Sequence, residues 1–252
     1  MNAPLDHTAS KAGPGATCII DAMLWVGRFG IVDGEAQEET PWVGAFPAGE
    51  EGEDTADLYL IVQPALPGSD EFCAELKEAI GSIFHKTRVT LTGGLLRAIQ
   101  SAHEDLREWN RKSIKEHRVA AGVSCLALRG HEAYLAQVAP AAALLLRAGT
   151  VLTLEPRLPD SLEPLGLYDE LRPDFTRLEL GPGDRLLLLS PTLNELLQGE
   201  DLPAMLALSG EEALPALYRR ARSLSDCAAL LLAMNGAGEQ LPAGEVGEVV
   251  ES

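Results

Sequence analysis

The sequence lacks any run of about 18 uncharged apolar residues, the length that a helix needs to cross a bilayer. Residues 1–16 have no apolar core of the kind found in secretory signals. The cysteines never form a C-x-x-C pair, which argues against a disulfide framework or a cysteine metal site. The sequence therefore predicts a cytoplasmic protein with reduced, buried thiols at Cys18, Cys73, Cys125 and Cys227.

Basic residues are also scarce. The chain has 20 Lys and Arg against 38 Asp and Glu, which gives a formal net charge of -18 and a pI near 4.6. A field of this sign repels the phosphates of nucleic acids and anionic lipid head groups. We therefore expect no nucleic acid and no membrane among the partners. Apolar residues make up 46% of the 252 residues, which is ordinary for one globular domain.

Most sequence signatures of catalysis are absent. The chain contains no G-x-x-x-x-G-K-[ST] phosphate loop, no G-x-S-x-G nucleophile elbow and no H-E-x-x-H zinc motif. None of the five histidines has the spacing of a zinc ligand. His103 falls near the apolar face of a predicted helix, where we expect a packed side chain rather than a ligand.

Composition divides the chain into a central folded region and two polar ends. Residues 1–16 and 235–252 are rich in Gly, Ala, Pro and Glu, which predicts a flexible N-terminus and a flexible C-terminal tail. The domain between them is predicted to span residues 17–234. Within it, residues 33–57 combine many acidic residues with Gly and Pro, a composition that predicts an acidic surface loop.

Apolar periodicity orders the elements of this domain. β-rich runs predict strands, and apolar residues three or four positions apart predict helices with one buried face. The predicted elements are strands at 18–26 and 58–63, helices at 72–84 and 91–109, a four-strand antiparallel meander over 119–154, a strand at 186–190, a helix begun by Pro191, further helix at 202–208 and 211–224, and a last strand at 227–234. Grouped helices without strict strand alternation predict an α+β layered sandwich.

Five segments of the central region carry motifs that occur in a recognisable order. They are Leu58–Gly68, Gly122–Leu128, Ala133–Leu145, Gly183–Glu195 and Ser225–Leu232. The fourth is similar to G-D-x-L-L-L-x-S-D-G-L-W-D/E and the fifth to a closing D-N-x-T-x-x-x-V strand. Together they resemble the PPM-type (type 2C) metal-dependent serine/threonine protein phosphatases. The resemblance implies a four-layer αββα sandwich, in which two antiparallel sheets are flanked by helices.

The resemblance also implies a metal site, which this sequence does not reproduce. In that family, aspartates at strand ends hold two Mn²⁺ or Mg²⁺ ions, which activate a water for attack on the phosphate. The matching positions here are Gln63 for the bridging aspartate, Pro140 for the aspartate of G-D-S-R and Pro191 for that of S-D-G. An amide does not offset two dications, and proline offers no side-chain oxygen. Asp226 alone matches an aspartate, and we interpret it as a vestigial ligand position.

Three hypotheses follow. The favoured one is a catalytically inactive pseudophosphatase, without catalytic residues, metal or cofactor, that binds a protein partner as a regulatory module. The alternative is an active metal-dependent phosphatase or other hydrolase with a rebuilt site around Asp226, drawing on Asp33 and Glu35, with Mn or Mg. Arg28 is the nearest candidate for the family's phosphate-binding arginine, at a different spacing. The third is an unrelated α+β sandwich.

Overall fold

The computed structural model describes residues 17–20, 24–37, 40–48, 56–87, 90–198 and 201–235. Over these residues the chain forms two antiparallel sheets and five α-helices. The seven-stranded sheet runs β1-β2-β12-β11-β8-β9, with β3 also paired to β2. Its strands are β1 (Thr17–Ile20), β2 (Leu24–Val32), β3 (Glu35–Gln37), β8 (Ala142–Arg147), β9 (Thr150–Leu154), β11 (Arg185–Leu189) and β12 (Cys227–Met234).

The five-stranded sheet runs β10-β7-β6-β5-β4. Its strands are β4 (Val43–Phe46), β5 (Asp57–Pro64), β6 (Ala121–Arg129), β7 (Glu132–Val138) and β10 (Asp174–Glu179). The helices are α1 (Asp70–Lys86), α2 (Leu91–Lys112), α3 (Pro191–Leu197), α4 (Leu202–Leu206) and α5 (Gly210–Ala221), with short 3-10 turns η1 (Lys115–His117) and η2 (Pro159–Ser161).

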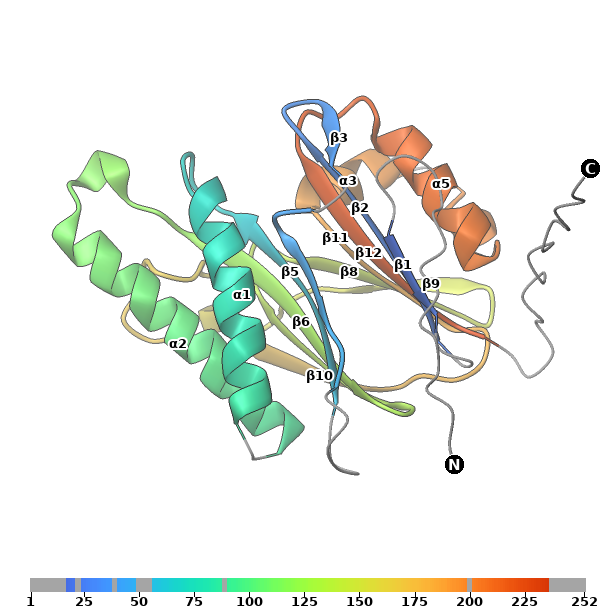
Figure 1. Ribbon diagram of the computed structural model, residues 1–252, viewed down its shortest axis with the longest axis horizontal. Coiled ribbons are helices and arrows are strands. Elements are labelled where there is room, and N and C mark those ends of the chain that lie inside the picture. The colour runs from blue at the N-terminus through green and yellow to red at the C-terminus, as the bar shows by residue number, and fades with distance from the viewer. Residues whose placement is uncertain are drawn as a thin grey trace, which may run out of the picture.

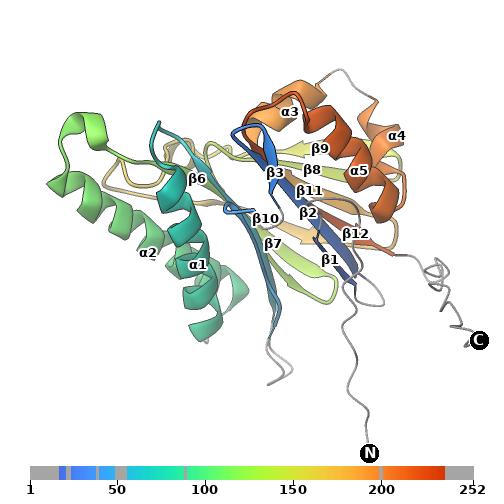
Figure 2. The same cartoon turned by 45° about the horizontal axis from the view of Figure 1, so that its top comes forward.

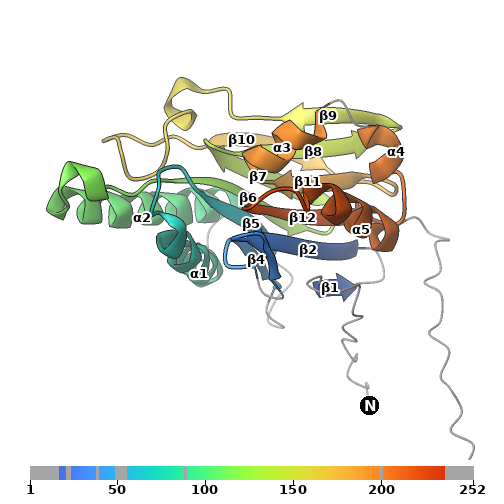
Figure 3. The same cartoon turned by 90° about the horizontal axis from the view of Figure 1, so that it is seen from above.

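These elements form four layers. Helices α1 and α2 pack against strands of the five-stranded sheet, and α3, α4 and α5 pack against strands of the seven-stranded sheet (Figures 1 and 2). The two sheets face each other between the helical layers, as Figure 3 shows from above. This is the predicted α+β fold, an αββα sandwich of two antiparallel sheets flanked by helices.

Strand β11 shows why the central strands read as unbroken apolar runs. Leu186 and Leu188 point into the core between the sheets, whereas Leu187 and Leu189 point into the core beneath α3–α5. Successive side chains of a strand face opposite sides, so a strand that is covered on both sides needs an apolar residue at every position. Strand β12 follows the same rule over all eight of its residues, which are all buried.

Several predicted elements are confirmed. The strands predicted at 58–63 and 227–234 correspond to β5 and β12, and the two predicted helices correspond to α1 and α2. Pro191 begins α3, as proline does at first helical turns because its missing N–H would have no intrahelical partner there. The described part of the chain contains no helix that is long and apolar enough to cross a membrane.

The predicted four-strand meander is wrong in part: its four strands are present as β6, β7, β8 and β9, but they do not lie in one sheet. β6 pairs with β7 and β8 pairs with β9, but the first hairpin belongs to the five-stranded sheet and the second to the seven-stranded sheet. The chain changes sheets at Ala139-Pro140-Ala141, between Val138 and Ala142. Strands that are buried on both faces carry the same apolar pattern in either sheet, so periodicity does not show this crossing.

The acidic surface loop predicted over 33–57 is also wrong in part. Its residues include β3 and β4, and Trp42 and Val43 are buried at 4% and 0% exposure. The short run Trp-Val-Gly-Ala-Phe is apolar enough to pair with β5, although its acidic neighbours dominate the composition. Residues 38–39 and 49–55 of this segment lie outside the described residues, as do 1–16 and nearly all of the predicted tail.

Smaller differences concern element limits. The strand predicted at 18–26 spans the end of β1 and the start of β2. Strand β10 was not predicted, because its charged residues interrupt the apolar signal. Trp109, predicted on the buried face of the long helix, is 48% exposed and packs with one side of its ring against Phe72, at 4.8 Å between ring centroids.

A charged network closes the turn between β10 and β11. Asp184 is 6% exposed and accepts hydrogen bonds from the Gly181 N–H at 2.9 Å and from Arg147 Nε at 3.1 Å. Arg147 Nη2 also donates to the Glu179 carbonyl at 2.6 Å, which connects β8 of one sheet to β10 of the other. The hydrogen bonds to Asp184 raise the pKa of Arg147 above its ordinary value.

We predict that Asp184→Ala lowers the free energy of unfolding by about 2 kcal/mol, because it leaves the Gly181 N–H and one side of Arg147 without their charged acceptor. Asp169→Ala is the matched control. Asp169 pairs with Arg107 but its side chain is 93% exposed, so its loss should change stability by less than about 0.5 kcal/mol. Urea unfolding of both variants measures the difference, and equal losses would contradict the prediction.

Candidate functional site

The structure brings the predicted site positions to one end of the sandwich. Gln63 lies near the end of β5, Pro191 begins α3 two residues after the end of β11, and Asp226 directly precedes β12. Pro140 lies in the connection between the sheets and packs on Gly122, where an added Cβ would come within 2.0 Å of the Pro140 carbonyl oxygen. Because Gly122 is the register partner of Gln63 on β6, Pro140 belongs to the same strand ends.

Gln63 joins the two sheets. Its side chain is buried, with 4% of the residue exposed, and its Nε2 donates a hydrogen bond to the Leu189 carbonyl at 3.2 Å. Gln63 belongs to the five-stranded sheet and Leu189 ends β11 of the seven-stranded sheet. The amide at the position that the resemblance equates with a bridging metal ligand is therefore used as a hydrogen-bond donor between the sheets.

Gln137 makes a second contact of the same kind. It is 2% exposed, and its Nε2 donates to the Leu154 carbonyl on β9 at 3.2 Å and to Ser124 Oγ at 3.4 Å. Leu154 and Leu189 lie on either side of the start of β8, next to Ala143 and Ala142. Sequence reasoning missed Gln137, although a glutamine within the otherwise apolar end of β7 was a signal for a buried hydrogen bond.

Asp226 holds a neighbouring turn. Its Oδ1 accepts a hydrogen bond from the Asp33 N–H at 3.1 Å, and the Ser225 carbonyl accepts one from the Gly34 N–H at 2.8 Å. Asp33 and Gly34 both have positive φ, at 53° and 78°, in the tight turn between β2 and β3. The Asp226 carbonyl also accepts a hydrogen bond from Thr192 Oγ1 at 3.2 Å. Asp226 thus connects the start of β12 to this turn and to α3.

The alternative site places Asp33 and Glu35 with Asp226. The structure does bring the Asp33 backbone to the Asp226 carboxylate, and Glu35 follows on β3; all three residues are exposed. Among the residues that the structure describes, no group of three His, Cys, Asp or Glu side chains is arranged to hold a metal ion.

The residues present do not fit the two-metal centre that the resemblance implies. Two hard dications need several anionic oxygen ligands, including one carboxylate that bridges them. At these strand ends Gln63 presents an amide that already donates to Leu189, and the two prolines present no side-chain oxygen. Asp226 is the one acidic side chain among the four predicted positions, and one of its oxygens accepts the Asp33 N–H.

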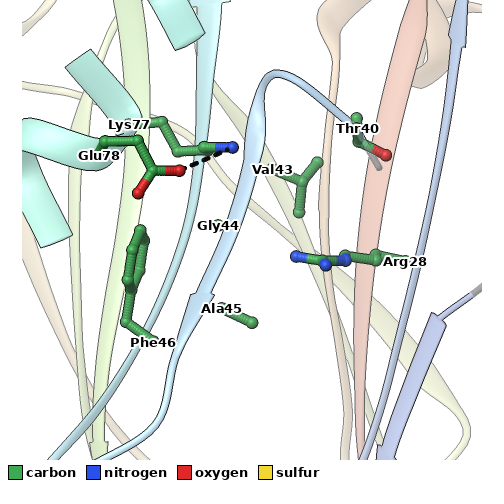
Figure 4. Close-up of a pocket in the computed structure, with 8 residues that line it drawn as sticks. All are labelled: Arg28, Thr40, Val43, Gly44, Ala45, Phe46, Lys77 and Glu78. Atoms are coloured by element: carbon green, nitrogen blue, oxygen red, sulfur yellow. Dashed lines mark ion pairs between the residues drawn. The ribbon is translucent and has the colours of Figure 1, made fainter. Parts of the chain in front are cut away.

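Arg28 lies elsewhere. It is on β2, opposite Leu230 of β12, and lines an open cavity of about 210 Å³ between β2 of one sheet and β4 of the other (Figure 4). The side chain extends towards β4, and on the opposite side of the cavity Lys77 of α1 forms an ion pair with Glu78 at 3.1 Å. The cavity shares no residue with the four predicted positions. Arg28 is therefore not part of the strand-end site.

His103 and the cysteines have structural environments. His103 is 4% exposed, its Nδ1 accepts the Gly166 N–H at 3.1 Å, and burial lowers its pKa, which confirms the expected packed side chain. Cys73, Cys125 and Cys227 are buried and free. Burial raises the pKa of Cys73 and of Cys227 to about 12, so both thiols stay protonated and unreactive. The side chain of Cys18 lies outside the described residues.

Solved structures that are similar to this chain include bacterial serine/threonine phosphatases. The enzyme from S. agalactiae aligns with a TM-score of 0.70 at 14% identity, covering 84% of this chain and 100% of that one. Stp1 from Staphylococcus aureus gives 0.70 at 15% identity, with 85% and 96% covered. PstP/Ppp from Mycobacterium tuberculosis gives 0.63 at 14% identity, with 85% and 100% covered.

The similarity lies in the fold. No family model matches the sequence, and no curated protein matches it. At these identities the alignments show a shared architecture of two antiparallel sheets between helical layers, over most of the chain. The predicted αββα sandwich is confirmed on both counts, by its strand topology and by these structures.

Gln63→Glu tests the inter-sheet hydrogen bond through its pH dependence. A glutamic acid reaches the Leu189 carbonyl as a donor only when protonated, so burial and this bond raise its folded-state pKa above the ordinary value of about 4.3. The folded variant then binds more protons than the unfolded one. Its stability relative to wild type should fall by up to about 1.4 kcal/mol per pH unit as pH rises from 5.

Urea unfolding at several pH values between about 5 and 8 measures this loss. Gln100→Glu on the exposed side of α2 is the control and should show no such slope, because its carboxylate stays in water in both states. A Gln63→Glu variant whose stability deficit is constant with pH would show that Gln63 does not donate across the sheets.

Proposed function

On the premise that the chain has the fold of a serine/threonine phosphatase, we propose that it is a catalytically inactive pseudophosphatase that acts as a protein-binding or regulatory module. The observation that supports this most directly is the Gln63–Leu189 hydrogen bond. At the position that the resemblance equates with a bridging carboxylate, this chain has a neutral amide that forms a hydrogen bond between the sheets.

The chemistry of the strand ends supports the absence of catalysis. With Gln63, Pro140 and Pro191 at three of the predicted ligand positions, Asp226 is the one carboxylate left among these positions, which is too few to neutralise two dications and orient a metal-bound water. For metals to enter, Gln63 would have to give up a buried hydrogen bond, which costs about 1–3 kcal/mol when a buried partner is left unpaired. Neutral groups also remove the cost of holding unpaired carboxylates in a buried cleft.

The surface beside these strand ends supports a role in protein binding. Leu158 and Leu162 flank η2 and are 46% and 53% exposed. The Ser161 carbonyl between them accepts the Ala139 N–H at 2.8 Å, next to Pro140. Exposed apolar side chains of this size are common where proteins contact one another. The net charge of -18 argues against nucleic acids and anionic membranes as partners, and we place the protein in the cytoplasm on its sequence.

The decisive experiment measures metal uptake and phosphate-ester hydrolysis by the purified chain. We expect isothermal titration with Mn²⁺ and with Mg²⁺ to show no stoichiometric binding, and neither ion to raise the melting temperature, because a ligand present at 100 times its Kd would stabilise the fold by about 2.7 kcal/mol. We expect no Mn²⁺-dependent hydrolysis of p-nitrophenyl phosphate.

Asp226→Ala and Asp226→Asn are the matched variants. If Asp226 is vestigial, both should be indistinguishable from wild type in metal binding and in turnover, whatever the loss of the Asp33 contact does to stability. Hydrolysis that needs Mn²⁺ and disappears in both variants would overturn the proposal and establish a rebuilt hydrolase centred on Asp226.

A further inference from the structure

The end of α2 exposes large apolar side chains to solvent. Trp109 in its last turn is 48% exposed, whereas the other two tryptophans, Trp25 and Trp42, are 2% and 4% exposed. Ile114, which follows the helix, is 64% exposed, more than any other large apolar side chain among the described residues. Burial of such side chains is favourable, so a place where two of them remain in water is a candidate for a protein contact.

Hydrogen bonds hold this end of the helix in one conformation. Ser113, the residue after α2, donates from both its N–H and its Oγ to the Trp109 carbonyl, at 3.1 and 3.0 Å. The buried Asn110 side chain donates to the Val119 carbonyl at 2.7 Å and accepts the Val119 N–H at 2.8 Å. It also donates to the Gly166 carbonyl at 2.9 Å. A surface that is already ordered loses little conformational entropy when it binds a partner.

The same segment concentrates positive charge in an acidic chain. Residues 107–118 contain five Lys and Arg against two Glu, an excess of three positive charges in a chain whose net charge is -18. Lys112 pairs with Glu108 at 2.9 Å and Arg111 pairs with the same carboxylate, so two bases share one acid. The three side chains are 47% to 74% exposed, so these ion pairs add little stability and the bases stay accessible to an acidic partner.

Helix stability explains only part of this cluster. Arg111 and Lys112 in the last turn of α2 complement the negative end of the helix dipole. Lys115 and Arg118 are exposed and lie beyond α2, at and just after the three-residue turn η1, where the dipole is small. Exposed bases next to exposed apolar side chains are the arrangement of protein interfaces, in which tryptophan and arginine are enriched.

Charge and apolar character together define the partner. An acidic segment is attracted to these bases, and a large apolar side chain within that segment can cover Trp109 and Ile114. Nucleic acid offers phosphates without such a side chain, and a duplex that extends beyond the cluster meets the repulsion of the acidic chain. A short peptide segment meets mainly the local positive charge, because salt screens the more distant acids.

We infer that the end of α2 is the docking surface for an acidic segment of a protein partner, with a large apolar side chain of that segment packed against Trp109 and Ile114. This α2-end surface consists of Trp109, Ile114, Arg111, Lys112, Lys115 and Arg118. The inference rests on the proposed protein-binding function and adds the chemistry of the partner to it. The surface leads into β6 at Ala121, the register partner of Pro64, so the segment docks at the same end of the sandwich as Gln63 (Figure 1).

Trp109 serves as the reporter of this surface, because the other two tryptophans are buried. The probes are synthetic peptides of about twelve residues built from Glu and Asp, each with a pair of apolar residues chosen from Leu, Ile and Phe and none with Trp. We expect binding to shift the tryptophan emission to shorter wavelength and to reduce its quenching by acrylamide, since the peptide covers Trp109. Anisotropy of the fluorescein-labelled peptides gives the Kd, which should rise with salt.

Variants of the apolar and of the basic side chains should both weaken binding. Trp109→Ala, and separately the double variant Lys112→Glu/Lys115→Glu, should each raise the Kd by about tenfold or more. Trp109→Phe keeps an aromatic ring, so it should raise the Kd by less than about threefold while it removes the fluorescence response. Arg219→Glu/Arg220→Glu is the matched control: these exposed bases end α5, on the other helical layer, and their reversal should change the Kd by less than about twofold.

The inference is overturned if no peptide binds, or if a bound peptide leaves Trp109 as quenchable as before. It is overturned as well if the Lys112/Lys115 reversal has no more effect than the α5 control, or if peptides with Gln and Asn in place of Glu and Asp bind equally well. Tighter binding of an oligothymidylate, or of a synthetic peptide of residues 236–252, contradicts it too, because the occupant is then nucleic acid or the chain's own tail.

These outcomes are distinguishable from failure of the proposed function. A peptide that binds away from Trp109 leaves a protein-binding module in place and removes only the α2-end surface. The titrations contain no metal and measure no turnover, so Mn²⁺-dependent hydrolysis contradicts catalytic inactivity without affecting the docking surface.

Discussion

The hydrogen bond between the Gln63 amide and the Leu189 carbonyl fixes the end of the sandwich where all the predicted site positions meet. Two sheets packed face to face are held mainly by apolar contacts, which do not set their relative position at the level of single atoms. A directional bond between buried groups does so, and Gln137 repeats it at the end of β9. Two further contacts lie at these strand ends. Pro140 packs on Gly122, and the Asp226 carboxylate accepts a hydrogen bond from the β2–β3 turn.

This arrangement reconciles a net charge of -18 with a site that is poor in acid. Acidic residues occupy turns and helix surfaces, where water solvates them, and Asp184 is a buried exception that is matched by Arg147. Between the sheets, amides do not carry the desolvation cost of carboxylates and satisfy strand-end carbonyls directly. The fold of the serine/threonine phosphatases is thus supported here by contacts that need no metal, in keeping with the general independence of fold and chemistry.

Sequence reasoning predicted those parts of the fold in which local pattern and burial agree. β5, β12, α1 and α2 have clear apolar periods, and Pro191 marks the start of α3. Sheet membership was not predictable in the same way, since β7 and β8 are similar apolar runs on either side of Pro140. The positions of Gln63 and Asp226 came from ordered motifs, whereas Gln137 and the carbonyl acceptors depend on which strands face each other, which is a property of the tertiary structure alone.

The most direct test of this account is crystallography with Mn²⁺ in the crystallisation buffer and diffraction data collected at the manganese absorption edge. The account predicts no anomalous peak among Gln63, Leu189 and Asp226, and an intact hydrogen bond between the Gln63 amide and the Leu189 carbonyl. A pair of anomalous peaks beside Asp226, with Gln63 turned away from Leu189, would contradict it.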